Sequence, residues 1–489
     1  MHAMEAPARA MQDHRFDDLY LYIDGEWIAA GSRDTSPVIN PANGRVIGRV
    51  PHATQEDVER ALIATQEAFD VWRRTPPYDR ARVLKRAADL IRERAAHIEW
   101  LMTREQGKAA HEARYEVASA ADYFEWFAEQ GKRAYGRVVP SRRPEVQQLV
   151  KRQPIGPVAA FTPWNFPAIT PARKLAAALA AGCSIIIKPG EECPATALAI
   201  ARALEDAGLP KGVVQILFGV PADISSQLID SPIIRKVTFT GSVPVGRLLA
   251  AQAARGVKPI TLELGGHGPV LVFNDADLDA AATLGAANRF RGTGQICISS
   301  TRFLIQRESL DAFTEKFVAA TRALKVGDGA LPETQVGPLS NLRQVEKTKA
   351  LIADAVARGA RILTGGKPIA GEGYFFEPTI LADVPLDAQV MQEEPFGPIA
   401  IVRPFDRFED GMAEANRLPY ALGGYVFTRD AKTAIHVGDE LEAGMIGVNH
   451  FSMIVSELPF GGFKESGYGS EGGEEGIDNY LVTKFISQV

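Results

Sequence analysis

The chain has 489 residues, of which 46% are hydrophobic and 23% are charged. This composition excludes extensive disorder and supplies about three domains' worth of chain at roughly 150 residues each. The 54 basic and 60 acidic side chains give a net charge of −6, which provides no basic surface for nucleic acid or anionic membranes. Three cysteines are too few for a disulfide framework. They favour a reducing compartment, so we expect a cytoplasmic protein.

No segment has the pattern of a membrane span or an export signal. The longest apolar run, residues 175–187, falls short of the ~20 apolar residues that a transmembrane helix needs. It instead predicts a buried helix that leads into a strand. Residues 1–18 lack the apolar core of a secretion signal, and their acidic side chains argue against a mitochondrial address.

Three helices are expected in the first part of the chain, from apolar residues that recur at helical spacing over residues 54–72, 83–101 and 117–127. Thr54 and Asp57 predict a capping box at the start of the first helix. Gly107 is expected to end the second helix, and the third is expected to stop near Gly131.

After residue 155 the pattern changes to short β-rich runs that alternate with helical segments. The runs are PVAAF, SIIIK, VVQIL and KVTFT, and later PVLVF and RFLIQ. Strands that alternate with helices predict βαβ units and parallel sheets. We therefore expect an α/β fold with two lobes in tandem.

Cys297 is the cysteine whose surroundings favour chemistry. It follows the flexible triplet 292–294 and precedes a predicted strand, which would place its sulfur at the mouth of a lobe. Cys183 lies in an apolar run and Cys193 in a turn-like stretch, so both are interpreted as structural. A lone cysteine is more often structural than catalytic, and position alone leaves both interpretations of Cys297 open.

Two further polar residues stand next to apolar or rigid neighbours. Glu263 lies between two leucines, where a carboxyl group has a raised pKa and can act as a general base. The alternative is a strand-end glutamate that faces solvent. Asn165, in FTPWNFP, can donate a hydrogen bond to an oxyanion, or it can satisfy its own turn.

The segment FTGSVPVG, residues 239–246, follows a predicted strand and enters a helix. Its two glycines and the helix N-terminus suit a pyrophosphate, although a tight turn explains them equally well. Lys188 and Glu191 can hold ribose hydroxyls at a strand end, or form a surface ion pair. The chain has no histidine or cysteine spacing typical of a metal site, so no metal is expected.

Taken together and in this order, the motifs FTPWNFP, KPGE, FTGSVPVG, ELGGHGP, GQIC, EEPFGP and PFGGFKESGYGSEG resemble the NAD(P)-dependent aldehyde dehydrogenase superfamily. The resemblance runs from about Ile23 to the C-terminus. Within the superfamily the chain is similar to succinate-semialdehyde and 2-oxoglutaric-semialdehyde dehydrogenases. The implied fold is a Rossmann-type parallel-sheet cofactor domain, an α/β catalytic domain and a small β element for oligomerisation.

The resemblance implies the following division of the chain. The cofactor domain takes residues 1–133 and 152–262, and residues 134–151 form the oligomerisation element. The catalytic domain takes residues 263–445. Residues 446–489 supply a substrate loop, a return segment and a C-terminal strand that completes the oligomerisation element, which implies a homodimer or homotetramer.

The resemblance also assigns catalytic roles. Cys297 would attack the aldehyde, and Asn165 with the Cys297 N–H would stabilise the oxyanion. Hydride loss would leave a thioester, which water activated by Glu263 would hydrolyse. Lys174 and Glu471 match positions that support this proton handling.

The cofactor would be held by nine residues, which are Thr162, Trp164, Lys188, Glu191, Gly241, Ser242, Gly246, Glu394 and Phe396. Lys188 and Glu394 match ribose-binding positions, Phe396 lies on the nicotinamide side, and Ser242 meets the pyrophosphate. A carboxylate at Glu191 would accept hydrogen bonds from the adenosine ribose and repel a 2′-phosphate. We therefore expect NAD rather than NADP.

The resemblance suggests a substrate with a distal carboxylate, because Arg173, Arg291 and Ser456 match the carboxylate-binding positions of succinate-semialdehyde dehydrogenases. A structural arginine before Cys297 is the alternative interpretation of Arg291. The apolar loop 450–457 leaves open a broader aliphatic or aromatic aldehyde. A CoA-acylating enzyme is disfavoured by Glu263, and a non-catalytic binding protein by the presence of Cys297, Glu263 and Asn165 together.

Overall fold

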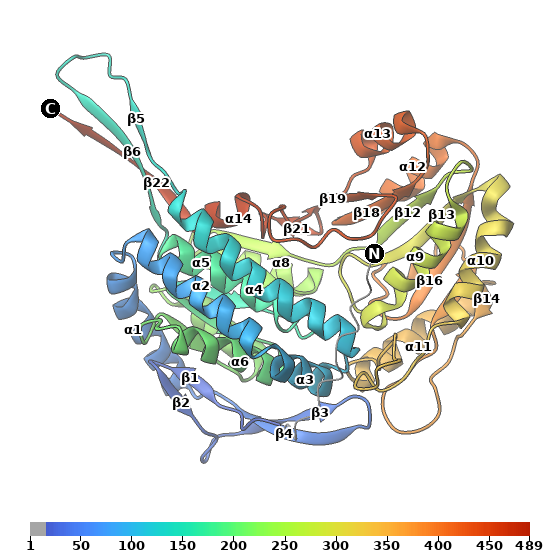
Figure 1. Cartoon of the computed structure of the whole chain (residues 1–489), viewed down its shortest axis with the longest axis horizontal. Helices are drawn as coiled ribbons and strands as arrows, with labels where there is room; N and C mark the ends of the chain where they lie inside the picture. The colour runs from blue at the N-terminus through green and yellow to red at the C-terminus, as the bar shows by residue number, and fades with distance from the viewer. Residues whose placement is uncertain (1–15) are drawn as a thin grey trace, which may run out of the picture.

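The computed structural model describes residues 16–489, so most of the N-terminal segment in which we expect no targeting signal lies outside the described residues. The fold is α/β, as predicted, with two large sheets and a small projecting sheet (Figure 1). Within residues 16–489, no helix is both long enough and apolar enough to cross a bilayer.

The first large sheet has eight strands in the order β2-β1-β9-β8-β7-β10-β11-β21. These strands are β1 (Leu21–Ile23), β2 (Glu26–Ile28), β7 (Val158–Phe161), β8 (Ile185–Lys188), β9 (Val214–Ile216), β10 (Lys236–Thr240), β11 (Ile260–Glu263) and β21 (Gly467–Tyr468). The five central strands, β7 to β11, run parallel, and β1 and β21 flank them antiparallel. The four β-rich runs after residue 155 are therefore confirmed as neighbouring strands of one sheet.

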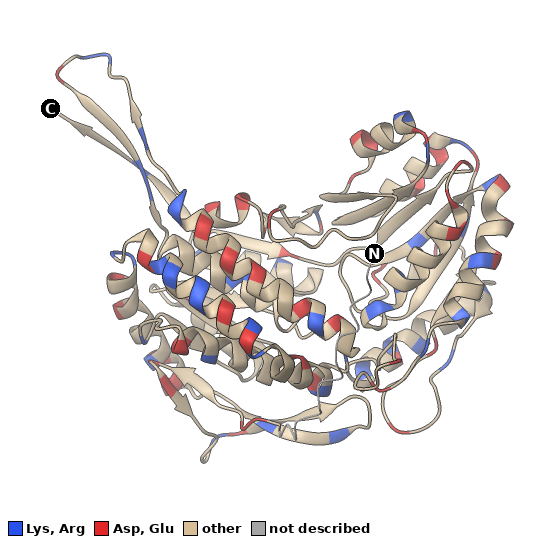
Figure 2. Cartoon of the chain, viewed as in Figure 1, with Lys and Arg blue, Asp and Glu red and all other residues tan. Residues whose placement is uncertain are grey.

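The helices of the first lobe are α1 (Gln55–Trp72), α2 (Pro77–Glu93), α3 (Ala95–Gln106), α4 (Ala110–Lys132), α5 (Ile169–Ala181), α6 (Pro194–Asp206), α7 (Pro221–Asp230) and α8 (Val243–Arg255). The capping box of Thr54 and Asp57 at the start of α1 is confirmed. The apolar run before Lys188 is a buried helix, α5, followed by a buried strand, β8, as expected. Both signs of charge lie on the surface helices α2 and α4 (Figure 2).

One helix boundary differs from the sequence-based expectation. The single helix predicted over residues 83–101 is wrong, because the chain breaks at Arg94, where φ is −98° and ψ is 7°. Gly107 ends α3 as predicted, in a left-handed conformation with φ of 82°. The predicted end near Gly131 is confirmed, because α4 ends at Lys132. A Cβ at Gly131 would lie 2.9 Å from the Ala180 carbonyl oxygen, so this glycine also allows α4 to approach α5 closely.

The second large sheet has seven strands in the order β14-β15-β16-β13-β12-β18-β19. These strands are β12 (Gly268–Val272), β13 (Ser300–Gln306), β14 (Arg361–Thr364), β15 (Thr379–Ala382), β16 (Ile399–Phe405), β18 (Gly423–Phe427) and β19 (Met445–Val448). Its helices are α9 (Leu278–Phe290), α10 (Leu310–Arg322), α11 (Leu342–Ala357), α12 (Phe408–Asn416) and α13 (Ala431–Glu440). All neighbours pair in parallel except the edge strand β14.

The third sheet projects from the body of the molecule, with the C-terminus near its tip (Figure 1). Its strands β5 (Arg137–Val139), β6 (Gln147–Pro154) and β22 (Leu481–Gln488) come from the segments predicted as the oligomerisation element. β22 pairs antiparallel with β6 over its whole length. The hairpin β3 (Thr35–Asn40) with β4 (Arg45–Pro51), the pair β17 (Tyr420–Ala421) with β20 (Phe463–Lys464), and the short helix α14 (Glu475–Asp478) complete the fold.

The C-terminal segment returns to the first lobe through β21, in which Gly467 pairs with Glu263 at the end of β11. The residues that follow the carboxyl ends of β7, β10 and β11 therefore lie close to residues from late in the chain. In open α/β sheets, this edge is where ligands bind. The domain boundaries drawn from the sequence stay a prediction.

Candidate active site

A cavity of about 310 Å³ lies at the carboxyl edge of the first sheet and also contacts the second lobe. Ten of the residues singled out in the sequence line it. They are Trp164, Asn165, Arg173, Gly241, Ser242, Glu263, Cys297, Glu394, Phe396 and Glu471. We call it the Cys297 cavity. Residues from six separate motifs thus meet in one place.

Cys297 sits after a strained turn that ends helix α9. Gly292, Thr293 and Gly294 all have positive φ, of 53°, 56° and 70°. The left-handed conformation costs a threonine free energy, and the Thr293 hydroxyl offsets that cost by donating to the Gly337 carbonyl at 2.8 Å. The Gly292 N–H donates to the Glu112 carboxylate at 2.8 Å. This turn fixes the backbone that leads to the sulfur.

The three cysteines differ in exposure, since Cys297 is partly exposed while Cys183 and Cys193 are buried. Burial raises the pKa of the Cys297 thiol to about 12, and the nearby carboxylate of Glu394 also raises it. The resting thiol is therefore protonated at neutral pH. A base is needed before it can act as a nucleophile.

Glu263 is buried at the end of β11, so the alternative of a solvent-facing glutamate is wrong. Both of its carboxyl oxygens lie in the Cys297 cavity without a hydrogen-bond partner. Burial raises its pKa well above the ordinary value, and the charge of Glu471 raises it further. Once deprotonated, such a carboxylate is a stronger base than an ordinary glutamate.

Asn165 lies in the loop between β7 and α5. Its side-chain Nδ2 donates to the Gln295 carbonyl at 2.9 Å, so the amide reaches the Cys297 loop instead of its own turn. One N–H of the amide is used in this bond. The other is available to a molecule in the cavity.

Lys174 and Glu471 form a buried ion pair behind the cavity. The Lys174 ammonium also donates to the Thr238 hydroxyl at 2.9 Å, and Lys174 does not line the cavity. Glu471 does, and its second carboxyl oxygen is buried without a partner. The charges of both residues act on Glu263: that of Glu471 raises its pKa, and that of Lys174 lowers it.

Five of the nine residues predicted to hold the cofactor line the Cys297 cavity. Ser242 is the N-cap of α8 and makes no side-chain capping bond, so the amide groups of that helix end are open. A Cβ at Gly265 would lie 2.5 Å from Glu394 Oε2, which shows how closely the backbone approaches this carboxylate. Trp164 and Phe396 meet edge to face at 5.7 Å. Thr162, two residues before Trp164, does not line the cavity. Its hydroxyl is buried and has no hydrogen-bond partner.

Several predicted site residues lie outside the Cys297 cavity. Lys188 and Glu191 form an ion pair in which Lys188 is buried, so the pair is not a surface one. Gly246 faces Leu264, whose side chain a Cβ would meet at 2.6 Å, so this glycine permits close packing of α8. Ser456 donates to Glu457 and lines neither cavity described here.

Arg291 lines a second cavity, of about 470 Å³, which we call the Arg291 cavity. The two cavities share four wall residues, which are Asn165, Phe166, Ile296 and Ile454. The Arg291 cavity is mostly apolar, with Tyr115, Phe451 and Met453 among its walls. The two arginines predicted to bind one carboxylate thus belong to adjoining cavities.

Both arginines have buried nitrogen atoms without hydrogen-bond partners, Nε and Nη2 in Arg173 and Nε in Arg291. The Arg173 guanidinium is buried and lies 3.8 Å from the centre of the Phe460 ring. Buried guanidinium N–H groups normally have acceptors. Arg173 therefore has donors without acceptors at the wall of the Cys297 cavity.

Two basic residues of helix α11, Arg343 and Lys347, also line the Cys297 cavity and were not predicted from the sequence. The Lys347 ammonium donates to the Glu394 carbonyl at 2.9 Å. Their spacing of four residues puts both on one face of a helix. That spacing was the available signal, but only the packing of the second lobe shows which face meets the cavity.

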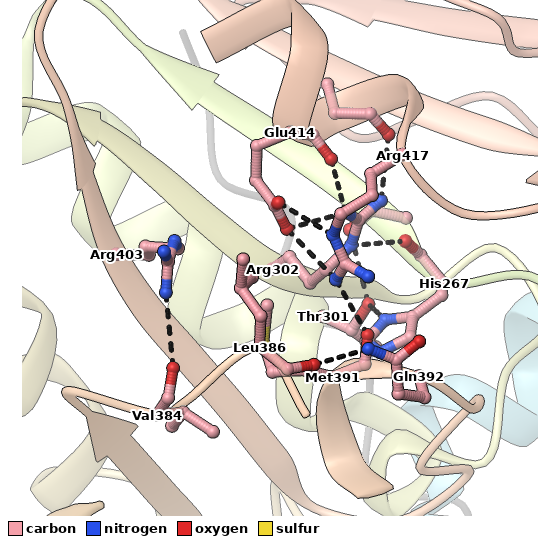
Figure 3. Close-up of polar contacts among 12 residues, drawn as sticks. His267, Thr301, Arg302, Val384, Leu386, Met391, Gln392, Arg403, Glu414 and Arg417 are labelled. Carbon is pink, nitrogen blue, oxygen red and sulfur yellow. Dashed lines mark hydrogen bonds and ion pairs between the residues drawn. The ribbon is translucent and has the colours of Figure 1, made fainter. Parts of the chain in front are cut away.

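A polar network holds the chain at His267, four residues after Glu263 (Figure 3). The His267 ring nitrogens contact the Thr301 hydroxyl at 2.6 Å and the Val390 carbonyl at 2.9 Å. Arg302 donates to the His267 carbonyl at 3.1 Å and pairs with Glu414. Burial lowers the pKa of His267 well below its ordinary value, so the ring is neutral. Among the described residues, no group of three or more His, Cys, Asp or Glu side chains is arranged to hold a metal ion.

The model of the aldehyde dehydrogenase family matches residues 27–486, and the chain belongs to that family. It is 49% identical to 4-(hydroxymethyl)benzenesulfonate dehydrogenase from Comamonas testosteroni, over 96% of this chain and 98% of the relative. It is 41% identical to the NADP(+) succinate-semialdehyde dehydrogenase of Escherichia coli, over 95% and 96%.

Among solved structures, the chain is similar to succinate-semialdehyde dehydrogenase from Burkholderia pseudomallei, with a TM-score of 0.95 and 44% identity. The match covers 98% of this chain and 99% of that one. The fold, the family and the oxidation of aldehydes with a nicotinamide cofactor are thereby shown.

Proposed function

We propose that this protein oxidises an aldehyde with a distal anionic group to the carboxylic acid, by way of a cysteine thioester and with NAD as the preferred cofactor. The main support for this proposal is the Cys297 cavity, which is lined by the thiol, by a carboxyl group without a hydrogen-bond partner and by a buried arginine with unpartnered nitrogens. The thiol and carboxyl group supply the chemistry, and the arginine supplies selectivity for an anion.

In the first half of the reaction, the Cys297 sulfur attacks the aldehyde carbon and forms a thiohemiacetal. The free N–H of Asn165 and the Cys297 backbone N–H stabilise the oxyanion, and each such donor contributes about 3 kcal/mol. Glu263, which lies in the same cavity, accepts the thiol proton. A bound nicotinamide supplies the acceptor for the hydride that the thiohemiacetal carbon loses.

In the second half, the thioester on Cys297 is hydrolysed. Glu263 takes a proton from water as the water attacks the acyl carbon, and the Cys297 thiolate leaves. Glu471 lies near Glu263, and its unpartnered carboxyl oxygen can accept the proton next. The Lys174 ammonium is only a donor, and it holds Glu471 in place through their ion pair. Hydrolysis instead of transfer to CoA is supported by the presence of this buried carboxyl group.

The anionic group of the substrate has two candidate forms. A semialdehyde carboxylate, succinic or 2-oxoglutaric, is supported by relatives named succinate- and glutarate-semialdehyde dehydrogenases. A sulfonated aromatic aldehyde is supported by the relatives named for 4-(hydroxymethyl)benzenesulfonate, together with the aromatic walls of the Arg291 cavity. A guanidinium binds carboxylate and sulfonate oxygens by the same paired N–H donors.

The preference for NAD rests on Glu191. Its carboxylate forms an ion pair with Lys188 at the end of β8, where an adenosine ribose is expected. A fixed negative charge there favours ribose hydroxyls and disfavours a 2′-phosphate. The similarity to an enzyme named for NADP(+) makes this a point for direct measurement.

The assembly is proposed to be a homo-oligomer formed through the projecting sheet. Tyr135, Val138 and Phe485 on or beside its strands are 62–73% exposed, which is unusual for large apolar side chains on a thin sheet. A dimer and a tetramer are both compatible with this surface. A cytoplasmic location stays a prediction.

The deciding experiment follows NADH absorbance with succinic semialdehyde, 2-oxoglutaric semialdehyde, 4-sulfobenzaldehyde and benzaldehyde, for the wild type and Cys297→Ser. We expect the anionic aldehydes to have higher kcat/KM than benzaldehyde, and Cys297→Ser to abolish all activity. Absence of NADH formation with every aldehyde, or a preference for benzaldehyde, would refute the proposal. A CoA-dependent product would refute the hydrolytic second half.

A further inference from the structure

The Asn165 loop is held by a buried ion pair that does not touch the reacting atoms. Lys108 follows the end of helix α3, and Glu116 lies in helix α4. Their side chains are 4% and 1% exposed and form an ion pair. Such pairs are costly to bury unless hydrogen bonds satisfy the remaining donors and acceptors.

All three N–H directions of the Lys108 ammonium are accounted for. One is used by Glu116 and one by the main-chain carbonyl of Asn165, at 2.9 Å. The ammonium also lies 4.1 Å from the centre of the Phe166 ring. Although Lys108 borders the Arg291 cavity, its charge is therefore engaged within the protein and is not offered to a substrate.

Glu116 completes the arrangement on the other side of the same loop. Its second carboxyl oxygen accepts from the Ala168 and Ile169 N–H groups, at 2.8 and 3.2 Å. These are the first amides of α5, the helix that carries Arg173 and Lys174. The pair thus fixes the main chain at Asn165 and at the start of α5.

We propose that Lys108 and Glu116 are positioning residues that hold the Asn165 amide in register with Cys297. The inference rests on the proposed function, because it assigns Asn165 to the oxyanion. The Asn165 side chain is anchored to the Cys297 loop by one N–H, through Gln295. The direction of its other N–H is then set by its main chain, which the Lys108–Glu116 pair fixes from behind. Displacements of about 1 Å in such a donor cost on the order of 10²-fold in rate.

The test uses the double variant Lys108→Met with Glu116→Gln, which removes both charges and keeps similar side-chain volumes. We expect kcat for aldehyde oxidation to fall about 10–100-fold, with KM for NAD unchanged. Lys108→Arg, which keeps the pair, should retain more activity than Lys108→Met. The control is Arg33→Met with Asp57→Asn, which removes a comparable ion pair at the start of α1, away from both cavities. The control should lower the midpoint of thermal unfolding and leave kcat unchanged.

A cycle with Asn165→Ala separates positioning from general stability. If the pair acts through Asn165, its removal in the Asn165→Ala background should change kcat less than twofold. The inference would be overturned if removing the pair lowered kcat as much in the Asn165→Ala background as in the wild type. It would also be overturned if removing the pair left kcat unchanged in the wild-type background.

Hydrolysis of 4-nitrophenyl acetate supplies a second readout, since acylation of Cys297 also forms an oxyanion and needs no cofactor. The same pattern across the cycle is expected. A wild type that hydrolyses the ester but oxidises no aldehyde would refute the proposed function and leave the inference decided by the ester rates.

Discussion

Arg173→Met should convert this protein from an enzyme for anionic aldehydes into one that favours uncharged aldehydes. Arg173 is 5% exposed, packs against Phe460 at 3.8 Å, and has two nitrogens without partners. Methionine fills much of the same space and offers no donor. The substitution thus removes the anion contacts while keeping the packing of the long side chain.

The magnitude follows from the two open donors. A hydrogen bond to a charged group contributes about 1.5–3 kcal/mol, so two contribute about 3–6 kcal/mol. At about 1.4 kcal/mol per factor of ten, kcat/KM for succinic semialdehyde should fall about 10²- to 10⁴-fold. Butanal has the same carbon chain without the carboxylate, and its kcat/KM should stay within about threefold.

The assay is the ratio of kcat/KM for these two aldehydes, measured by NADH absorbance. The ratio matters because the Arg173 charge also lowers the pKa of Glu263, whose burial and whose neighbour Glu471 raise it. Both substrates require Glu263, so that effect cancels. Arg291→Met is the companion variant, since Arg291 lines the adjoining cavity. An equal loss for both aldehydes in Arg173→Met would refute the reasoning and make Arg173 a structural residue.

Three further outcomes are expected. Burial raises the pKa values of both Glu263 and Cys297, and catalysis needs the deprotonated forms. The kcat/KM should therefore rise from pH 6 to pH 9, and a decline over that interval in a pH–rate profile would contradict it. Ellman's reagent should modify one thiol in the native protein and all three in guanidinium chloride, because Cys183 and Cys193 are buried; Cys297→Ser should leave none reactive in the native state. Glu191→Ser should raise the ratio of NADP to NAD kcat/KM at least about tenfold, since unit charges about 4 Å apart near a protein surface interact by about 4 kcal/mol. No relative gain with NADP would contradict the proposed role of Glu191.

Local pattern was sufficient to predict much of the fold. The capping box at Thr54, the helix end at Gly107 and the parallel strands after residue 155 follow from neighbouring residues alone. The break at Arg94 was not predictable in this way, because the helical pattern continues through it. The packing role of Gly131 was not predictable either, because it depends on α5, some fifty residues later.

The site was predictable as a set of motifs but not as a geometry. Glu263 taken alone favoured a solvent-facing position, and it is buried because β21, from about two hundred residues later, pairs with its strand. No local pattern predicts the Lys108–Glu116 pair, since a single lysine and a single glutamate are ordinary on a protein surface. Arg343 and Lys347 became visible only through the packing of α11 against the cavity.

The return of the chain through β21 has a consequence for how the protein is made. Phe460 and Glu471 line the Cys297 cavity, and the Leu264 N–H donates to the Ser466 carbonyl at 2.9 Å. The first sheet therefore lacks an edge strand, and Glu263 lacks its cover, until residues 460–471 have left the ribosome. Contacts between residues so far apart in sequence form late in folding. The nascent chain thus completes the Cys297 cavity only after residue 471 has been made, when the strands of both large sheets that precede it have already been synthesised.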